Sequence, residues 1–224
     1  MATSKSMKKL RFAVVAVDAA CFRIVAGDLH VLLGRVNVEP HYKNRWGLIG
    51  GLILSSENAD VAVERHLRNK AGIGRVYKEQ LYTFSSIGRD PRGRVISVAY
   101  LCLAPEALTE SVGDVETRWC SVRDIPALAY DHDEILNSAL ERLRSRIGYT
   151  NIIQRLLPKE FTLTDLQTTY EIVLHKKLDK RNFRKKVLET KLVVTTDKKE
   201  RKGASRPAIL HKFSSRTVVN IEIL

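Results

Sequence analysis

The chain has 224 residues, of which 44% are hydrophobic and 28% charged, so it can bury a core and has the composition of a soluble protein. Its 38 Lys and Arg residues outnumber its 25 Asp and Glu residues, giving a formal net charge of +13. No stretch reaches the ~18 apolar residues that span a bilayer. Asp18 interrupts the N-terminal apolar run, so no signal peptide is expected. Three scattered cysteines exclude a disulfide framework and a Cys-rich zinc site, and we predict a cytoplasmic protein.

The positive charge is concentrated in the last third of the chain. Residues 151–224 carry 17 Lys or Arg and 8 Asp or Glu, which leaves only +4 of the net charge for the first 150 residues. Such an excess favours a polyanionic partner, although a solvated basic surface would also explain it. The sequence pattern changes near Gly148–Pro158, and we therefore predict two domains, residues 1–149 and 150–224.

The first domain alternates strand and helix signals. Strands are expected over the apolar or β-branched runs Leu10–Val17, Leu29–Val36, Trp46–Ile53, Gln80–Ile87 and Val95–Leu103. Gly27-Asp28 predicts a hairpin between the first two runs, and Gly50-Gly51 permits positive φ or close approach of a ligand. The turn-rich loop of residues 88–94 holds three arginines. Strands on both sides of a helix predict a mixed α/β or α+β sandwich.

That helix is expected from about residue 57 to residue 71. Small and apolar residues recur there at helical spacing. Ser55 or Ser56 can cap its start, and Gly72 can end it.

A second helix is expected to open at Asp131. Apolar residues recur on one of its faces, at Ile135, Ala139, Leu143 and Ile147. The acids at its start suggest metal binding, but a capping box, with Asp131 as the cap and Glu134 at the third position, explains them more simply.

The second domain has the element order of a winged helix-turn-helix. Thr162 and Asp165 form the pattern of a capping box for a helix that runs to about His175, and Asp179 can cap a short basic helix. Two strands, Leu192–Thr196 and Ala208–Phe213, then flank a basic loop. Helices followed by a basic hairpin predict DNA binding by the short basic helix and by the hairpin, which forms the wing.

The DNA-reading residues are predicted from their positions on these elements. On a helical wheel Phe183, Val187 and Leu188 share one side of the basic helix. The other side holds Arg181, Asn182, Lys185 and Lys186. Guanidinium, ammonium and amide groups on such a face suit guanine edges, phosphates and adenine. The predicted DNA-binding residues are Thr164, Lys180, Arg181, Asn182, Arg184, Lys185, Lys199, Arg201, Lys202 and Arg206. A solvated basic face is the alternative interpretation.

Gly51, Glu57, Arg65, Gly72 and Ile73 stand at the spacing of the motif GX5EX7REUXEEXGU, so the chain resembles the Nudix hydrolase family. In active members of that family the glutamates of the motif gather Mg²⁺, which activates water against a pyrophosphate. The positions of those glutamates are occupied here by His66, Asn69 and Lys70. An imidazole, an amide and an ammonium cannot replace three carboxylates, so we expect no metal site, no catalytic residue and no hydrolase activity.

Several further strings in the same order resemble the Nudix-related transcriptional regulators of the NrtR type. They are IGRDPRGRVISVAYL, LAYDHDEIL, FTLTDLQTTYE, LDKRNFRKKV and SRPAILHKF. The resemblance implies an α+β fold, in which an N-terminal Nudix-like α/β/α sandwich with a mixed sheet precedes a C-terminal winged helix-turn-helix domain. It also implies a repressor, commonly of NAD metabolism genes, that ADP-ribose or a related nucleotide releases from DNA without a required cofactor.

The resemblance places five residues near the ligand pocket, namely Arg35, Trp46, Arg65, Arg89 and Arg94. Arginines suit a diphosphate, and an indole can stack on a base. Each has a structural alternative, because Arg65 could hold its helix to a neighbouring loop and Trp46 could lie in the core. We expect a homodimer on a palindromic operator, since paired modules of this kind read two half-sites.

Three other functions compete with this interpretation. A divergent pyrophosphatase could use Glu57 and Glu64 with unusual partners. Relatives of the same architecture are tied to sugar catabolism, which would give a sugar-derived effector. A nucleic-acid-binding protein without sequence preference, or a ribosome-associated protein, is the third alternative.

Overall fold

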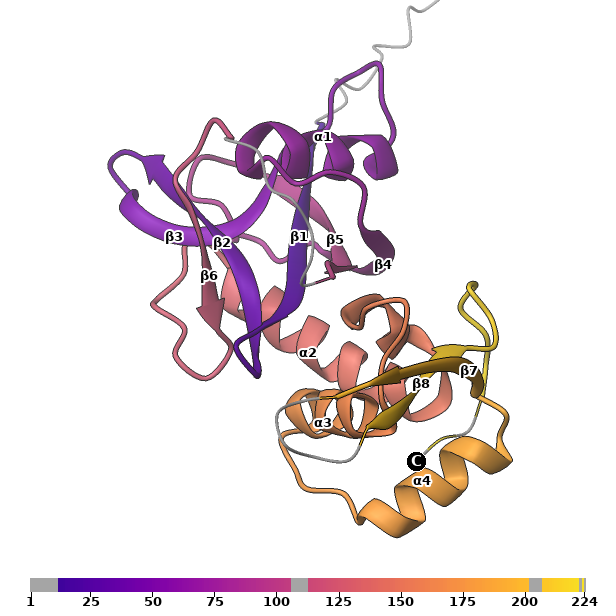
Figure 1. Ribbon diagram of the computed structural model, residues 1–224. Coiled ribbons are helices and arrows are strands. Elements are labelled where there is room, and N and C mark those ends of the chain that lie inside the picture. The colour runs from indigo at the N-terminus through magenta and orange to yellow at the C-terminus, as the bar shows by residue number, and fades with distance from the viewer. Residues whose placement is uncertain (1–11, 106–112, 202–206, 222, 224) are drawn as a thin grey trace, which may run out of the picture.

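The computed structural model describes residues 12–105, 113–201, 207–221 and 223 (Figure 1). Its N-terminal part contains a six-stranded sheet in the order β4-β5-β1-β3-β2-β6. The strands are β1 (Val14–Val25), β2 (Asp28–Val38), β3 (Tyr42–Leu52), β4 (Tyr77–Phe84), β5 (Val95–Leu103) and β6 (Thr117–Ser121). β1 pairs in parallel with β5 and antiparallel with β2 and β3, so the predicted mixed sheet is confirmed.

Two helices cover opposite faces of this sheet, α1 (Ala59–Ala71) and α2 (His132–Tyr149). Successive residues of a strand point to opposite faces, and β1 follows this rule. Ala19 and Cys21 pack in the cluster that contains Leu67 of α1, whereas Ala20 packs in the cluster that contains Ile135 of α2. The predicted α/β/α sandwich is therefore confirmed, with a layer of apolar side chains on each side of the sheet.

The C-terminal part is a winged helix, as predicted. It consists of the 3₁₀ helix η1 (Ile152–Leu156), α3 (Leu163–Leu174), α4 (Lys180–Glu189), β7 (Val193–Glu200) and β8 (Ala208–Phe213). Thr162 and Asp165 form the predicted capping box at the start of α3, and the Asp179 carboxylate accepts from Asn182 N–H at the start of α4. β7 and β8 pair antiparallel and form the wing. In the described part of the chain, no helix is long and apolar enough to cross a membrane.

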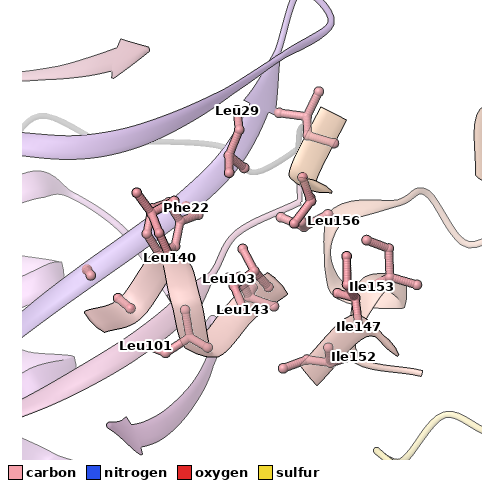
Figure 2. Packing of buried hydrophobic residues seen from close by; sticks show 14 of the residues in the cluster. Phe22, Leu29, Leu101, Leu103, Leu140, Leu143, Ile147, Ile152, Ile153 and Leu156 are labelled. Atoms are coloured by element: carbon pink, nitrogen blue, oxygen red, sulfur yellow. The ribbon is translucent and has the colours of Figure 1, made fainter. Parts of the chain in front are cut away.

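One hydrophobic core connects the two parts through α2. Figure 2 shows Phe22 and Leu101 of the sheet beside Leu140 and Leu143 of α2, with Ile153 of η1 close by. The same cluster of buried residues continues into α3 and α4. At the far end of α2, Arg144 Nε donates to the Val173 carbonyl of α3 at 3.1 Å. The boundary that we predict after residue 149 thus falls within a shared core.

Some element boundaries differ from the predicted ones. α1 is capped by Asn58, whose side chain accepts from Val61 N–H at 2.9 Å, so the predicted cap at Ser55 or Ser56 was wrong. The reason is a turn before the helix, in which Glu57 N–H bonds to the Leu54 carbonyl at 3.2 Å. Gly72 ends α1 in the left-handed conformation, as expected. The short elements β6 and η1 were not predicted, and Leu10 lies outside the described residues.

Tyr170→Phe should leave the winged helix as stable as the wild type or more stable, by about 1 kcal/mol. The Tyr170 side chain is fully buried against Phe183, and among the described residues its hydroxyl has no hydrogen-bond partner. Removing the hydroxyl therefore removes a desolvated polar group. Urea unfolding at equilibrium measures the change, and Tyr100→Phe is the control, because the Tyr100 hydroxyl bonds to Asp60. A loss of stability in Tyr170→Phe as large as that in the control would contradict the prediction.

Candidate ligand pocket and nucleic-acid interface

A cavity of about 470 Å³ lies where β1, β2 and β3 meet α1, the loop of residues 88–94 and the start of α2. Three of the five predicted ligand-binding residues, Arg35, Arg65 and Arg89, line it. Other lining residues include Asp18, His66, Lys70, Asp90, Arg92 and His132. The lining holds five Lys or Arg side chains and two carboxylates. Because the cations predominate, the cavity suits an anionic ligand.

Asp18 is the buried carboxylate of this cavity. Ser97 Oγ donates to its Oδ2 at 2.6 Å, and Arg89 Nη2 donates to the same oxygen at 3.3 Å. Burial opposes ionisation, but His132, Ser97 and Arg89 outweigh it and hold the pKa of Asp18 below its ordinary value. Gly50 is the register partner of Asp18 in β3, and a Cβ at Gly50 would collide with the Asp18 carboxylate. Glycine is therefore required there.

His132 is held in one tautomer. Leu48 N–H donates to its Nδ1 at 2.9 Å, so the proton of the neutral ring lies on Nε2. Nε2 faces Oδ1 of Asp18 at 3.3 Å. The first residue of α2 thus contributes directly to the wall of the cavity.

Asp131 stands at the N-cap of α2, as predicted, but its side chain makes no capping hydrogen bond, so the predicted capping box with Glu134 was wrong. Its carboxylate instead accepts two hydrogen bonds from Arg89, at 2.8 Å from Nε and 2.6 Å from Nη2. The Arg89 side chain is only 4% exposed. The forked pair gives the carboxylate two hydrogen bonds from an ionised donor, whereas a capping bond would join it to a neutral backbone N–H. The loop that carries Arg89 is therefore fastened to the start of α2.

Arg65 holds Glu57 with two hydrogen bonds, one of them 2.9 Å from Nε to Oε2, and also donates to the Leu52 carbonyl at 2.9 Å. The hydrogen bonds from Arg65 lower the pKa of Glu57 to about 2. Glu64, the second acid of the competing enzyme hypothesis, does not line the cavity. It accepts instead from Lys78 Nζ at 2.7 Å.

Glu57→Gln should destabilise the fold at neutral pH, with a smaller effect in acid. The ordinary pKa of this carboxyl is 4.5 and its folded value is about 2. Ionised Glu57 therefore stabilises the fold above pH 4.5, and the stabilisation is lost as the pH falls from there through about 2. Urea unfolding from about pH 7 to about pH 3 measures the difference in unfolding free energy between wild type and variant. Glu64→Gln is the matched control. A difference in unfolding free energy that does not change with pH would contradict the prediction.

The three residues at the positions of the family glutamates have different surroundings. His66 is buried, with Nε2 at 3.0 Å from the Leu52 carbonyl, and Asn69 is exposed outside the cavity. Lys70 lines the cavity and donates to the Gly50 carbonyl at 2.6 Å. Over the described ranges, no three His, Cys, Asp or Glu side chains group closely enough to hold a metal ion. An ammonium in this position does not fit Mg²⁺, which prefers oxygen ligands.

Trp46 and Arg94 lie outside the cavity. Trp46 is 8% exposed and belongs to the core, with the guanidinium groups of Arg35 and Arg118 at 4.1 Å and 4.3 Å from its ring centroid. Arg94 donates to the carbonyls of Ser85 and Ser86 at 2.7 Å and 3.1 Å. Trp46 thus has the core position of its structural alternative, and Arg94 binds the loop that precedes it.

Among the charged and histidine side chains that line the cavity, those not predicted to bind the ligand are Asp18, His66, Lys70, Asp90, Arg92 and His132. Asp18 had a usable signal, because a lone acid within an apolar strand has to be paired inside the fold. Arg92 stands in the arginine-rich loop and donates to Asp90 at 2.9 Å and 2.6 Å. His132 gave no signal, since its partners come from distant parts of the chain.

The basic face of α4 is exposed, as a DNA-reading helix requires. Its outward residues are Lys180, Arg181, Asn182 and Lys185. Phe183 and Val187 are buried beneath it, whereas Leu188 is 50% exposed, so its predicted place on the buried side was wrong. Arg184 donates to Thr164 Oγ1 of α3 at 2.9 Å, which ties two predicted DNA-binding residues together.

The wing presents further cations. Lys199 and Arg201 are exposed, and Lys198 donates to the Glu160 carboxylate at 3.0 Å. Lys202 and Arg206 lie outside the described residues. Two exposed basic elements, α4 and the wing, therefore belong to the same winged helix (Figure 1).

Comparisons with known proteins match both parts of the chain. A model of the NUDIX domain matches residues 15–142, and a model of the NrtR DNA-binding winged helix domain matches residues 153–213. The ADPR responsive transcriptional repressor NtrR of Acinetobacter baylyi is 34% identical over 207 residues, which cover 90% of this chain and 82% of that protein. An ADP-ribose pyrophosphatase of Methanocaldococcus jannaschii is 30% identical over 59% of this chain and 78% of its own length.

Two solved structures of Shewanella oneidensis NrtR are also similar. The complex with a 27mer DNA has a TM-score of 0.78 and 32% identity, covering 89% of this chain and 93% of that chain. The NUDIX domain complexed with ADP ribose has a TM-score of 0.54 and 31% identity, covering 60% of this chain and 90% of that chain.

Proposed function

The chain belongs to the Nudix-related transcriptional regulators of the NrtR type, and from this premise we propose that it is a DNA-binding repressor whose Nudix-like domain senses ADP-ribose. We propose NAD metabolism genes as its targets, and a cytoplasmic homodimer on a palindromic operator as its working form. The ligand domain is assigned to residues 1–149 and the DNA-binding domain to residues 150–224.

The observation that carries this proposal is the core shared by the cavity-bearing sheet, α2, α3 and α4. A ligand can change DNA binding only if it binds the DNA-bound and the released arrangements of the protein with different affinities. α2 provides a physical connection, because His132 lines the cavity at one end and Arg144 bonds to α3 near the other. A phosphate in the cavity would compete with Asp131 for Arg89 and so act on the start of α2.

ADP-ribose fits the proposal for two reasons. Its diphosphate is anionic, and the cavity lining has more cations than carboxylates. The similar NUDIX domain of Shewanella oneidensis NrtR was crystallised with ADP ribose. The proposed ligand contacts are the lining arginines Arg35, Arg65 and Arg89.

The proposed function is tested with the full chain and a duplex from its own promoter region. The protein should bind this duplex more tightly than a random duplex of the same length at moderate salt, and ADP-ribose should release it. Calorimetry with ADP-ribose and with a sugar phosphate identifies the class of effector. Equal affinity for both duplexes, or release by the sugar phosphate alone, would contradict the proposal.

The similar pyrophosphatase of Methanocaldococcus jannaschii makes enzyme activity the second candidate. The donor set argues against it, because Glu57 is bound by Arg65 and Lys70 lies in the cavity. We therefore propose that the chain has no catalytic residue and needs no metal. Turnover of ADP-ribose with Mg²⁺ or Mn²⁺ that Glu57→Gln abolishes would support the enzyme instead.

A further inference from the structure

The cations that line the cavity differ in how their charge is compensated. Four of the five donate hydrogen bonds to carboxylates. These pairs are Arg35 with Glu116, Arg65 with Glu57, Arg89 with Asp131 and Asp18, and Arg92 with Asp90. Each guanidinium thus has a counter-ion within the fold, so a ligand phosphate has to share it with an existing partner.

Lys70 is the exception. Its Nζ donates to the Gly50 carbonyl at 2.6 Å, and within the described ranges it forms no ion pair. Asp18 is the carboxylate that acts on it electrostatically, but Asp18 is already bound by Ser97 and Arg89. Within the described ranges, the charge of Lys70 at the wall of the cavity is therefore not neutralised by an ion pair.

Burial makes this lack of a counter-ion unfavourable. Removal from water lowers the pKa of Lys70, although the charge of Asp18 acts in the opposite direction. An ammonium that has given up part of its hydration gains more from an incoming anion than an exposed one does. The carbonyl of Gly50 uses one of the three ammonium donors, so two can still point to a ligand.

We propose that Lys70 binds the diphosphate of the nucleotide ligand and balances its negative charge, so that ligand binding needs no divalent cation. This inference rests on the proposed function, because it assigns a residue to the same ligand. Arg65 and Arg92 lie on the same cavity and have exposed side-chain fractions of 27% and 51%. They can add forked hydrogen bonds to the phosphate oxygens that Lys70 attracts as a point charge.

Calorimetry of the full chain with ADP-ribose tests the proposal, first in EDTA and then with added Mg²⁺. The wild type should bind equally well in both conditions. Lys70→Met should bind ADP-ribose on the order of tenfold more weakly or worse, as expected for loss of a hydrogen-bonded charge. Adenosine, which lacks phosphate, should bind both proteins with the same affinity.

Lys78→Met is the matched control, because Lys78 is also half-buried but pairs with Glu64 outside the cavity. Its affinity for ADP-ribose should equal that of the wild type. Thermal melting without ligand shows that each variant is folded. Unchanged affinity of Lys70→Met in EDTA, or wild-type binding only with Mg²⁺, overturns the inference while the proposed function stands. If the wild type fails to bind ADP-ribose in both conditions, the ADP-ribose-sensing function and the inference both fail.

Discussion

Alanine at Arg181 or Lys185 should weaken binding of the operator duplex by roughly tenfold or more, as expected for loss of a base or phosphate contact in a major groove. Both side chains are exposed on α4, opposite the buried Phe183 and Val187. Neither is part of the apolar layer that holds α4 to α3. We therefore expect these variants to lose affinity without losing stability.

The dependence on salt separates the two kinds of contact. Loss of a phosphate contact should reduce the slope of log affinity against log salt concentration by about 1, whereas loss of a base contact should relax sequence preference. Fluorescence anisotropy with operator and random duplexes at several salt concentrations measures both quantities. Arg68→Ala, which removes an exposed arginine from α1, is the control of equal charge. If Arg68→Ala weakens binding as much as Arg181→Ala, the loss reflects net charge and α4 does not read DNA.

Arg89→Met should destabilise the protein by about 3–5 kcal/mol, the range for removing one partner of a buried ion pair. The side chains of Arg89, Asp18 and Asp131 are 4%, 8% and 11% exposed, so the change leaves two carboxylates with little access to water. The double variant Arg89→Met/Asp131→Leu should recover more than half of the loss, because well-packed apolar groups can replace a buried pair.

Urea unfolding of the wild type, both single variants and the double variant measures the interaction free energy between Arg89 and Asp131.

The same proteins report on ligand response, because Asp131 lies next to His132 at the start of α2. The double variant should still bind the operator, since α4 is unchanged, but ADP-ribose should release it less effectively. Additive losses of stability in the double variant would contradict the assigned pairing.

The fold could be predicted largely because its signals are local. Thr162 with Asp165 and Asp179 with Asn182 stand three residues apart, so their caps can be read from sequence spacing. The alternation of β1 side chains between the two faces of the sheet and the left-handed Gly72 follow from equally local rules. Short elements such as β6 and η1 carry too few residues for a recognisable period.

The candidate site was harder to predict, because its contacts join distant parts of the chain. Asp131 has the local pattern of a helix cap, yet Arg89, 42 residues away, takes its carboxylate. The stacking of Arg35 on Trp46 depends on cross-strand pairing of β2 with β3, so no local pattern around Trp46 indicates this contact. The sequence places Lys70 at the position of a family glutamate, but its missing counter-ion is visible only in the folded cavity.

Reciprocal titration tests most directly whether the cavity and the winged helix are coupled. The affinity for ADP-ribose is measured with and without saturating operator duplex, and the affinity for the duplex is measured with and without saturating ADP-ribose. Coupling requires that each ligand changes the affinity for the other by the same factor. We predict that both affinities fall by one common factor. Unchanged affinities in both titrations would contradict a connection between the cavity and α4.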